Sequence, residues 1–364
     1  YWDGGGKLYR LITKEIQTGI VPTGADSDGA GSKYGRGTTE NTTVPSQWTT
    51  NVLLDLSSTT SRPDGFKQPI TAAPSVGTDG HNFWVYFGTG RFFDAKDKTD
   101  DQQQSYYGIK EPIAMTIESL VRTRMFTWEE VEFPYNDYAD HPGSKGLWKV
   151  DDIQVGLSFD IDHSLLSCRS GSGCLPTTLE ENTLGDLNDF IGGTALDTWD
   201  LDSGMKTAPK QADLSVAPPC TTNSCVDGWY RDFYPYENRE RNVGQATLLG
   251  GLVTYTTYQP FNDVCQAEGN AYLYGLYYRT GTGWYKSIFG TKGEDGNGNA
   301  VEKLSLGRGL ATTPNLHVGG GSGSGHGGVK AFVQTSTGEI QEIEQDNLPI
   351  NNYQTGRSKF RQCN

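Results

Sequence analysis

Apolar and polar residues alternate in short runs along most of this chain, and turn-forming residues separate the runs. The stretch from Gln68 to Phe93 reads QPITAAPSVGTDGHNFWVYFGTGRFF: a small-residue run after two prolines, a polar turn, an aromatic run and Gly-Thr-Gly. Alternation with a period of two places successive side chains on opposite faces of a strand. The pattern predicts two strands joined by a turn, with the second strand at Phe83 to Phe87.

The same order of runs recurs in the second half of the chain. The segment ITAAPSVGTDGHNFWVYFGTGRFF (70–93) aligns with LATTPNLHVGGGSGSGHGGVKAFVQTSTGEI (310–340) and, more loosely, with NVGQATLLGGLVTYTTYQPFNDVCQAEGNAYLYGLYYRTG (242–281). Units of four short strands that repeat every ~40–45 residues are typical of β-propeller blades. We therefore expect an all-β fold, namely a β-propeller of about seven blades, or fewer with insertions. A β-helix or a sandwich would show tighter or less regular spacing.

Residues 145–222 interrupt this pattern. They contain few β-branched runs and hold three of the six cysteines. Within them, TLEENTLGDLNDF (178–190) predicts a short helix with Asn182 or Thr183 as its N-cap. We interpret the stretch as a loop-rich insertion in a single domain that spans residues 1–364.

Composition narrows the class of protein. The 47 glycines and the 14 phenylalanines, 19 tyrosines and 8 tryptophans suit many short strands joined by tight turns. The net charge of -14 argues against nucleic acid as a partner, because binding phosphates needs a concentrated basic surface. No apolar run approaches the length of a transmembrane helix. The chain starts at Tyr1 inside what reads as a strand motif, which indicates a processed product or a fragment of a longer secreted precursor.

The cysteines indicate an oxidising compartment, since their even number favours disulfide pairing in a secreted protein. The close pairs Cys168/Cys174 and Cys220/Cys225 lie in polar segments and suggest stapled loops, which would leave Cys265 with Cys363. Six cysteines allow fifteen connectivities, so other pairings stay open.

Four motifs in order resemble a known family. The first is QPITAAPSVG with WVYFGTGRFF, and the second is QSYYGI; together these two span residues 68–109. The third is GWYRDF (228–233), and the fourth is GGLVTYTTYQPFNDVC with GNAYLYGL (250–276). This order is similar to the C-terminal β-propeller of the PilY family, secreted proteins of bacterial type IV pilus tips. The resemblance implies a non-enzymatic module at the cell surface that acts in pilus biogenesis, retraction control and adhesion. It also implies pilin or minor pilins as partners, and no organic cofactor.

The resemblance implies a calcium site as well, because some members of the family carry a loop of the EF-hand type. In EDGNGNAVE, Asp295, Asn297 and Asn299 occupy positions one, three and five, where oxygen ligands project to one side of a turn. Glu302 falls at position eight, although such a loop would have a ligand at nine. A hairpin turn rich in Asp, Asn and Gly is the alternative.

The rival class is an extracellular propeller enzyme or lectin, such as a quinoprotein-like dehydrogenase or a polysaccharide-binding protein. The adjacent cysteines of the quinoprotein site are absent from the sequence, as are GxSxG and GK[ST] motifs. Neighbouring carboxylates such as Asp151 and Asp152 are plentiful, and we expect them to be exposed charges. Trp229 and the turn Gly88 to Gly90 are expected to be structural.

Overall fold

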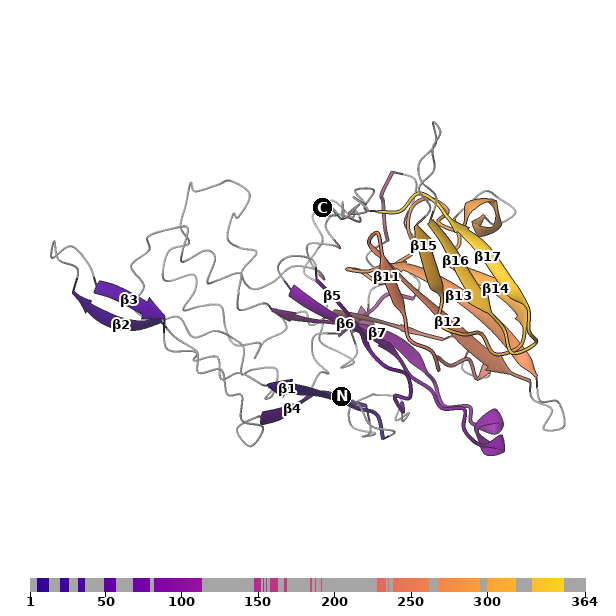
Figure 1. Ribbon diagram of the computed structural model, residues 1–364, viewed down its shortest axis with the longest axis horizontal. Coiled ribbons are helices and arrows are strands. Elements are labelled where there is room, and N and C mark those ends of the chain that lie inside the picture. Colours follow the sequence, from indigo (N-terminus) through magenta and orange to yellow (C-terminus); the bar gives the residue numbers. More distant parts are fainter. Residues whose placement is uncertain are drawn as a thin grey trace, which may run out of the picture.

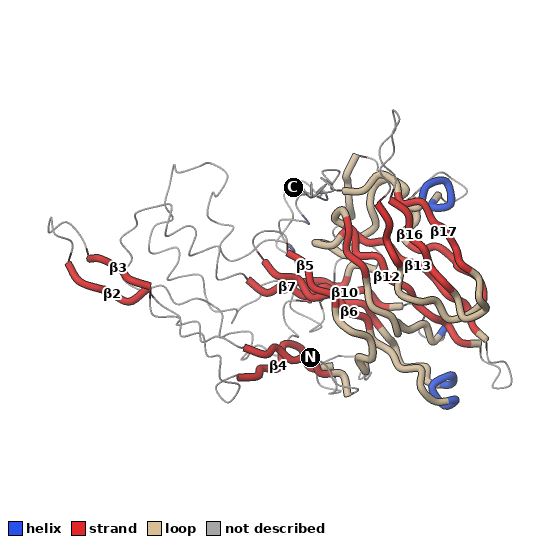
Figure 2. Tube along the Cα trace, in the orientation of Figure 1, coloured by secondary structure: helices blue, strands red, loops and turns tan. Residues whose placement is uncertain are grey.

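The part of the protein that the structure describes consists mainly of β-sheets, and most of their strands pair antiparallel (Figures 1 and 2). The computed structural model describes residues 5–12, 20–25, 32–36, 49–56, 68–78, 82–112, 147–151, 158–162, 167–168, 228–233, 238–261, 268–294, 300–318 and 329–349, and the single residues Ile153, Val155, Leu184, Leu187, Ile191 and Pro235. Over these ranges the all-β prediction is confirmed. No helix in this part of the chain is long and apolar enough to cross a membrane.

Three of the sheets contain the repeated segments. Sheet I has the order β5-β6-β7-β10-β8-β9, sheet II the order β11-β12-β13-β14, and sheet III the order β15-β16-β17. The strands of sheet I are β5 (Ser75–Thr78), β6 (Asn82–Gly88), β7 (Ser105–Pro112), β10 (Gly228–Asp232), β8 (Leu147–Lys149) and β9 (Ser167–Cys168). Those of sheet II are β11 (Thr247–Leu249), β12 (Leu252–Pro260), β13 (Gly269–Tyr277) and β14 (Lys303–Arg308). Those of sheet III are β15 (Asn315–Val318), β16 (Val329–Gln334) and β17 (Ile340–Gln345).

Each repeat predicted from the sequence thus begins an antiparallel meander. Two small sheets, β1-β4 and β2-β3, and two 3-10 helices complete the described elements. Their bounds are β1 (Lys7–Ile12), β2 (Ile20–Ala25), β3 (Ser32–Arg36), β4 (Thr49–Asp55), η2 (Ala95–Thr99) and η6 (Gly290–Gly293). The first strands of consecutive meanders are neighbours, since β11 contacts both β5 and β15. Within the described ranges, however, the sheets do not close into a ring.

The sheets pack face to face through apolar side chains that alternate along the strands. On β12, Val253 and Tyr255 face sheet I, whereas Leu252 belongs to the core shared with sheet III. On β6, Trp84 and Tyr86 face sheet II, whereas Phe87 lies in the core that includes residues of β1 and β4. Sheets I and II are therefore apolar on both faces. This is why their strands read as aromatic runs with few charges.

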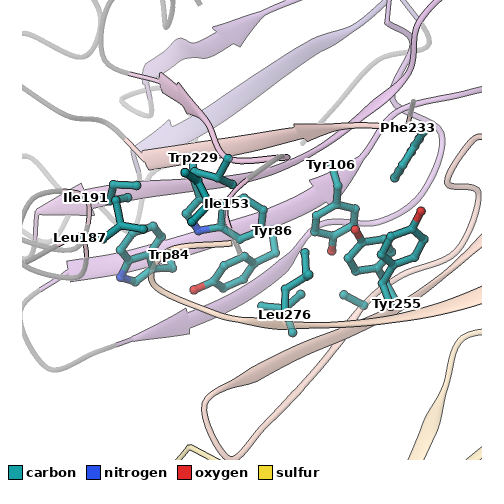
Figure 3. Packing of buried hydrophobic residues seen from close by; sticks show 14 of the residues in the cluster. Trp84, Tyr86, Tyr106, Ile153, Leu187, Ile191, Trp229, Phe233, Tyr255 and Leu276 are labelled. Atoms are coloured by element: carbon teal, nitrogen blue, oxygen red, sulfur yellow. The ribbon is translucent and has the colours of Figure 1, made fainter. Parts of the chain in front are cut away.

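The core between sheets I and II is rich in aromatic side chains (Figure 3). The Tyr106 and Tyr255 rings are stacked with centroids 3.6 Å apart, and they join β7 to β12 across the two sheets. Trp229 is fully buried beside them, and its Nε1 donates to the carbonyl of Tyr278 at 3.0 Å. The structural role expected for Trp229 is confirmed.

The stretch 145–222 contributes more to sheet I than a loop-rich insertion suggests. Its residues Leu147–Lys149 form β8, which pairs in parallel with β10. Leu184 and Leu187 are helical and buried, in line with the helix predicted over 178–190, and so is Ile191, one residue beyond it. Leu187 and Ile191 join the core between sheets I and II. Of the cysteines, Cys168 alone lies within the described residues, so the disulfide pairing stays a prediction.

Candidate functional site

A chain of hydrogen bonds runs through one end of sheet I and ends at a carboxylate. Ser105, at the start of β7, lies directly opposite Asp232, at the end of β10. The Ser105 Oγ accepts a hydrogen bond from Gln68 Nε2 at 2.7 Å and donates to Asp232 Oδ1. Gln68 in turn accepts from the Tyr107 hydroxyl and donates to the carbonyl of Gln103 at 2.8 Å. Because Gln68 supplies the proton that Ser105 accepts, the Ser105 proton is directed at Asp232.

Lys149 joins this carboxylate to a second one. Its Nζ lies 3.1 Å from Asp232 Oδ2 and 3.0 Å from Asp151 Oδ2. The other oxygen of Asp151 accepts from the backbone N–H of Asp232 at 2.9 Å. We call Ser105, Lys149, Asp151 and Asp232 the Lys149 cluster. The parallel pairing of β8 with β10 produces it, since it places Lys149 beside Tyr230, two residues before Asp232.

The Lys149 cluster is shielded from water, and this shifts its proton equilibria. The side chains of Asp151 and Asp232 are 11% and 7% exposed, and that of Lys149 is 30% exposed. Burial and the nearby Asp232 charge raise the pKa of Asp151 to about 6, against the lowering effect of Lys149 and Arg231. Burial lowers the pKa of Lys149, but the two carboxylates outweigh it and raise that pKa to about 12. The expectation that Asp151 is an exposed charge is therefore wrong.

A second ion pair lies on the opposite side of β10. The Arg231 guanidinium pairs with Glu302 and donates to the carbonyls of Gly281 at 3.1 Å and Asp151 at 3.0 Å. Burial lowers the pKa of Arg231, but the Glu302 and Asp151 charges outweigh it and raise that pKa above its ordinary value. The arrangement joins sheet I to the residue before β14, in sheet II.

The predicted calcium ligands are placed only in part. Asp295, Asn297 and Asn299 lie outside the described residues. Glu302 is described, and its Oε1 is bound to Arg231, so a cation there would share this carboxylate with a guanidinium. Among the described residues, no three His, Cys, Asp or Glu side chains gather closely enough to hold a metal ion.

Asp97, within η2, shows how another carboxylate is fixed by protein groups. The buried Asp97 pairs with Arg91 at 2.8 Å and accepts from the backbone N–H groups of Phe93 and Asp94 at 2.7 and 2.9 Å. Burial raises the pKa of Asp97, but the hydrogen bonds of Asp94, Phe93 and Arg91 outweigh it and lower that pKa.

Arg241 binds the backbone before, within and after η2. Its Nη atoms donate to the carbonyls of Arg91, Asp97 and Asp100 at 2.7, 2.6 and 3.2 Å. Gly90 has a φ of 129°, and a Cβ there would lie 2.3 Å from that of Arg241. The Gly-Thr-Gly turn is thus structural, as the sequence predicts.

Sequence reasoning missed the Lys149 cluster. Its members lie in three separate segments. Ser105 and Asp232 belong to the motifs QSYYGI and GWYRDF, but neither motif by itself indicates a polar site. The available signal was the strand pairing: once GWYRD pairs with SYYGI, Ser105 and Asp232 become cross-strand partners. The parallel pairing of β8 with β10, which a long segment of the chain separates, had no comparable signal in the sequence.

The described part of the chain is an all-β protein, and its stacked sheets enclose a shielded polar cluster. No protein-family model matches this chain, and a search of curated proteins finds no relative. Among solved structures, the chain is similar to one described as the crystal structure of Pseudomonas aeruginosa PilY1 C-terminal domain, with a TM-score of 0.40 and 16% sequence identity. The match covers 78% of this chain and 46% of that one, so the chain spans about half the length of the matched domain.

Proposed function

We propose that this chain is part of the C-terminal β-propeller of a PilY-like protein, and that it acts outside the bacterial cell in type IV pilus biogenesis, retraction control and adhesion. The observation that carries the proposal is the ordered set of motifs from Gln68 to Leu276. The segments that hold these motifs fall on β5, β6 and β7, on β10, and on β12 and β13. The family resemblance and the strand pattern therefore concern the same residues.

The arrangement of the sheets supports a propeller. Sheets I and II use both faces for apolar packing, as blades with a neighbour on each side do. The first strands of sheets I, II and III are successive neighbours, which suits inner strands around a common axis. We propose that each meander is a blade. The partners are then pilin or minor pilins, and the module performs no catalysis on a substrate.

A genetic replacement tests this function. In the bacterium of origin, the native gene is deleted and then restored with the natural sequence, with Trp229→Ala or with Val76→Ser. Trp229 is fully buried in the aromatic core, whereas Val76 is 65% exposed. We expect the deletion and Trp229→Ala to lose surface pili and twitching motility, and the natural sequence and Val76→Ser to restore both. Normal piliation in the deletion strain would refute the proposal.

Binding experiments separate this function from its rival. Purified chain is presented with the minor pilins of the same bacterium and, in parallel, with an array of polysaccharides. Binding to the pilins supports the pilus module, whereas saturable binding to one glycan class without pilin binding would favour the lectin.

Calcium at residues 295–302 is part of the proposal. Asp295→Asn tests it without disturbing the ion pair between Arg231 and Glu302. A folded-state ligand raises stability, so calcium should raise the melting temperature of the natural chain over that in EDTA, and less so that of the variant. Equal melting temperatures of the natural chain in calcium and in EDTA would show that calcium does not bind at residues 295–302.

A further inference from the structure

We propose that Lys149 and Asp232 form an intramolecular isopeptide bond, and that the other members of the Lys149 cluster promote its formation. The bond would join β8 covalently to β10 inside sheet I. This inference is independent of the pilus function, because it concerns chemistry between side chains of the folded chain itself.

The geometry places an amine beside a carboxyl group on neighbouring strands. Lys149 Nζ lies 3.1 Å from Asp232 Oδ2, an oxygen bonded to the Cγ that the amine would attack. Parallel pairing of β8 with β10 sets this distance, and the backbone of both strands is fixed in the sheet. Holding two reactants in this way replaces a bimolecular encounter with a unimolecular step.

Asp232 is the carboxyl group prepared for attack. Its Oδ1 accepts a hydrogen bond from Ser105, whose own oxygen is held by Gln68. A donor fixed on this oxygen stabilises the negative charge that develops there when an amine adds to the carboxyl carbon. Asp151 has no side-chain hydroxyl donor in the described structure, which makes Asp232 the electrophile of the two.

Asp151 is placed to move protons. Its Oδ2 lies 3.0 Å from Lys149 Nζ, and its Oδ1 is held by the N–H of Asp232. Its raised pKa, about 6, allows it to take up and release a proton near neutral pH. The high pKa of Lys149 makes the neutral amine scarce, so the bond is expected to form slowly in the folded protein rather than during folding.

The step balances without any other reactant. A proton passes from the Lys149 ammonium to the Asp232 carboxylate, which gives a neutral amine and a neutral acid. Nζ then attacks Cγ of Asp232, while Ser105 donates to Oδ1. Asp151 accepts a proton from Nζ and delivers it to Oδ2. The Nζ–Cγ bond forms, the Cγ–Oδ2 bond breaks, and one water molecule leaves, with no oxidation or reduction.

The intact mass of the purified full chain tests the bond. After incubation of the folded protein at about pH 6, which is near the Asp151 pKa, the chain is reduced, denatured and weighed. We expect its mass to be lower than the calculated mass by one water molecule, and a tryptic peptide in which Lys149 is joined to Asp232. A folded chain that keeps its full mass after prolonged incubation would overturn the proposal.

Variants assign the roles within the Lys149 cluster. Lys149→Arg and Asp151→Asn should keep the full calculated mass. Asp232→Asn should lose one ammonia instead of one water, because the amide then provides the leaving group. Loss of ammonia by Asp151→Asn, with loss of water by Asp232→Asn, would overturn the choice of Asp232 as electrophile.

The chain contains its own control for simple ion pairing. Lys303 Nζ lies 2.6 Å from Glu240 Oε2, a carboxylate whose side chain is 1% exposed, and among the described residues no second carboxylate forms an ion pair with this lysine. We expect no peptide that joins Lys303 to Glu240. Equal cross-linking at both sites would show that proximity alone is sufficient and would remove the role of Asp151.

Discussion

The hydroxyl of Ser75, the first residue of β5, donates to the carbonyl of Ala246, the residue before β11, over 2.6 Å. The same contact recurs one repeat later, where Thr247, the first residue of β11, donates to the carbonyl of Pro314 over 2.6 Å. Consecutive meanders are thus joined by an equivalent hydrogen bond at the start of each first strand. The recurrence shows that the repeats share a geometry as well as a sequence pattern.

Removing these hydroxyls should loosen the junctions between sheets. Ser75→Ala and Thr247→Val are each expected to lower the free energy of unfolding by about 1 kcal/mol, the usual net value of one hydrogen bond. The two contacts share no partner, so the double variant should lose about 2 kcal/mol. Urea unfolding measures both effects. Ser305→Ala, at an exposed position of β14, is the control and should change little.

The strands were predictable because their buried side chains alternate regularly between the two faces of a sheet. Trp84 and Tyr86 alternate with Val85 and Phe87, and each set packs against a different neighbour. A period of two with aromatic residues on both faces is a strong local signal. The helix over 178–190 was a separate prediction with Asn182 or Thr183 as its cap, and the helical positions Leu184 and Leu187 agree with it.

The polar contacts were not predictable, because they depend on which strands become neighbours. Asp151 reads as one of two adjacent surface carboxylates, and its burial follows from the pairing of β8 with β10. Glu302 reads as a metal ligand until sheet II brings it to Arg231. Pairing over long sequence separations leaves no period in the sequence, so such contacts need the structure.

Gly108 tests the packing of the aromatic core. A Cβ at this position would lie 2.4 Å from the Trp229 ring, which is fully buried and cannot move aside. Gly108→Ala should therefore cost about 1–3 kcal/mol of stability through overpacking.

Thermal unfolding followed by tryptophan fluorescence measures this loss. Gly244→Ala is the matched control, since its nearest neighbour would be Thr256 Oγ1 at 3.4 Å. Equal melting of the two variants would contradict the tight contact between Gly108 and Trp229.

Asp97 should make stability depend on pH in the acid range. A carboxylate whose pKa is lower in the folded state stabilises the fold above its unfolded pKa, and this contribution is lost as the pH falls. The folded pKa of Asp97 lies below the ordinary value of 3.8. Asp97→Asn should lose about 1.5–3 kcal/mol near neutral pH, the range for hydrogen bonds to a charged group.

The difference between Asp97→Asn and the natural chain should shrink as the pH falls below that value. Urea unfolding at about pH 7 and about pH 3 gives the comparison. Asp94→Asn, at the exposed N-cap of η2, is the control: it keeps a capping oxygen, and it should show a much smaller loss. A loss for Asp97→Asn that stays constant across this range would exclude the charge as its cause.

Arg231 and Glu302 should behave as a coupled pair between sheets I and II. The Arg231 side chain is 8% exposed and that of Glu302 is 25% exposed. Arg231→Met leaves a half-buried carboxylate without its cation, which should cost about 3–5 kcal/mol. Replacing both residues, with Arg231→Met and Glu302→Gln, should cost less than the sum of the two single changes, because no charge is then left unpaired. Urea unfolding of the natural chain, the two single variants and the double variant gives a double-mutant cycle. If the two single losses of stability add up to that of the double variant, the ion pair contributes nothing of its own.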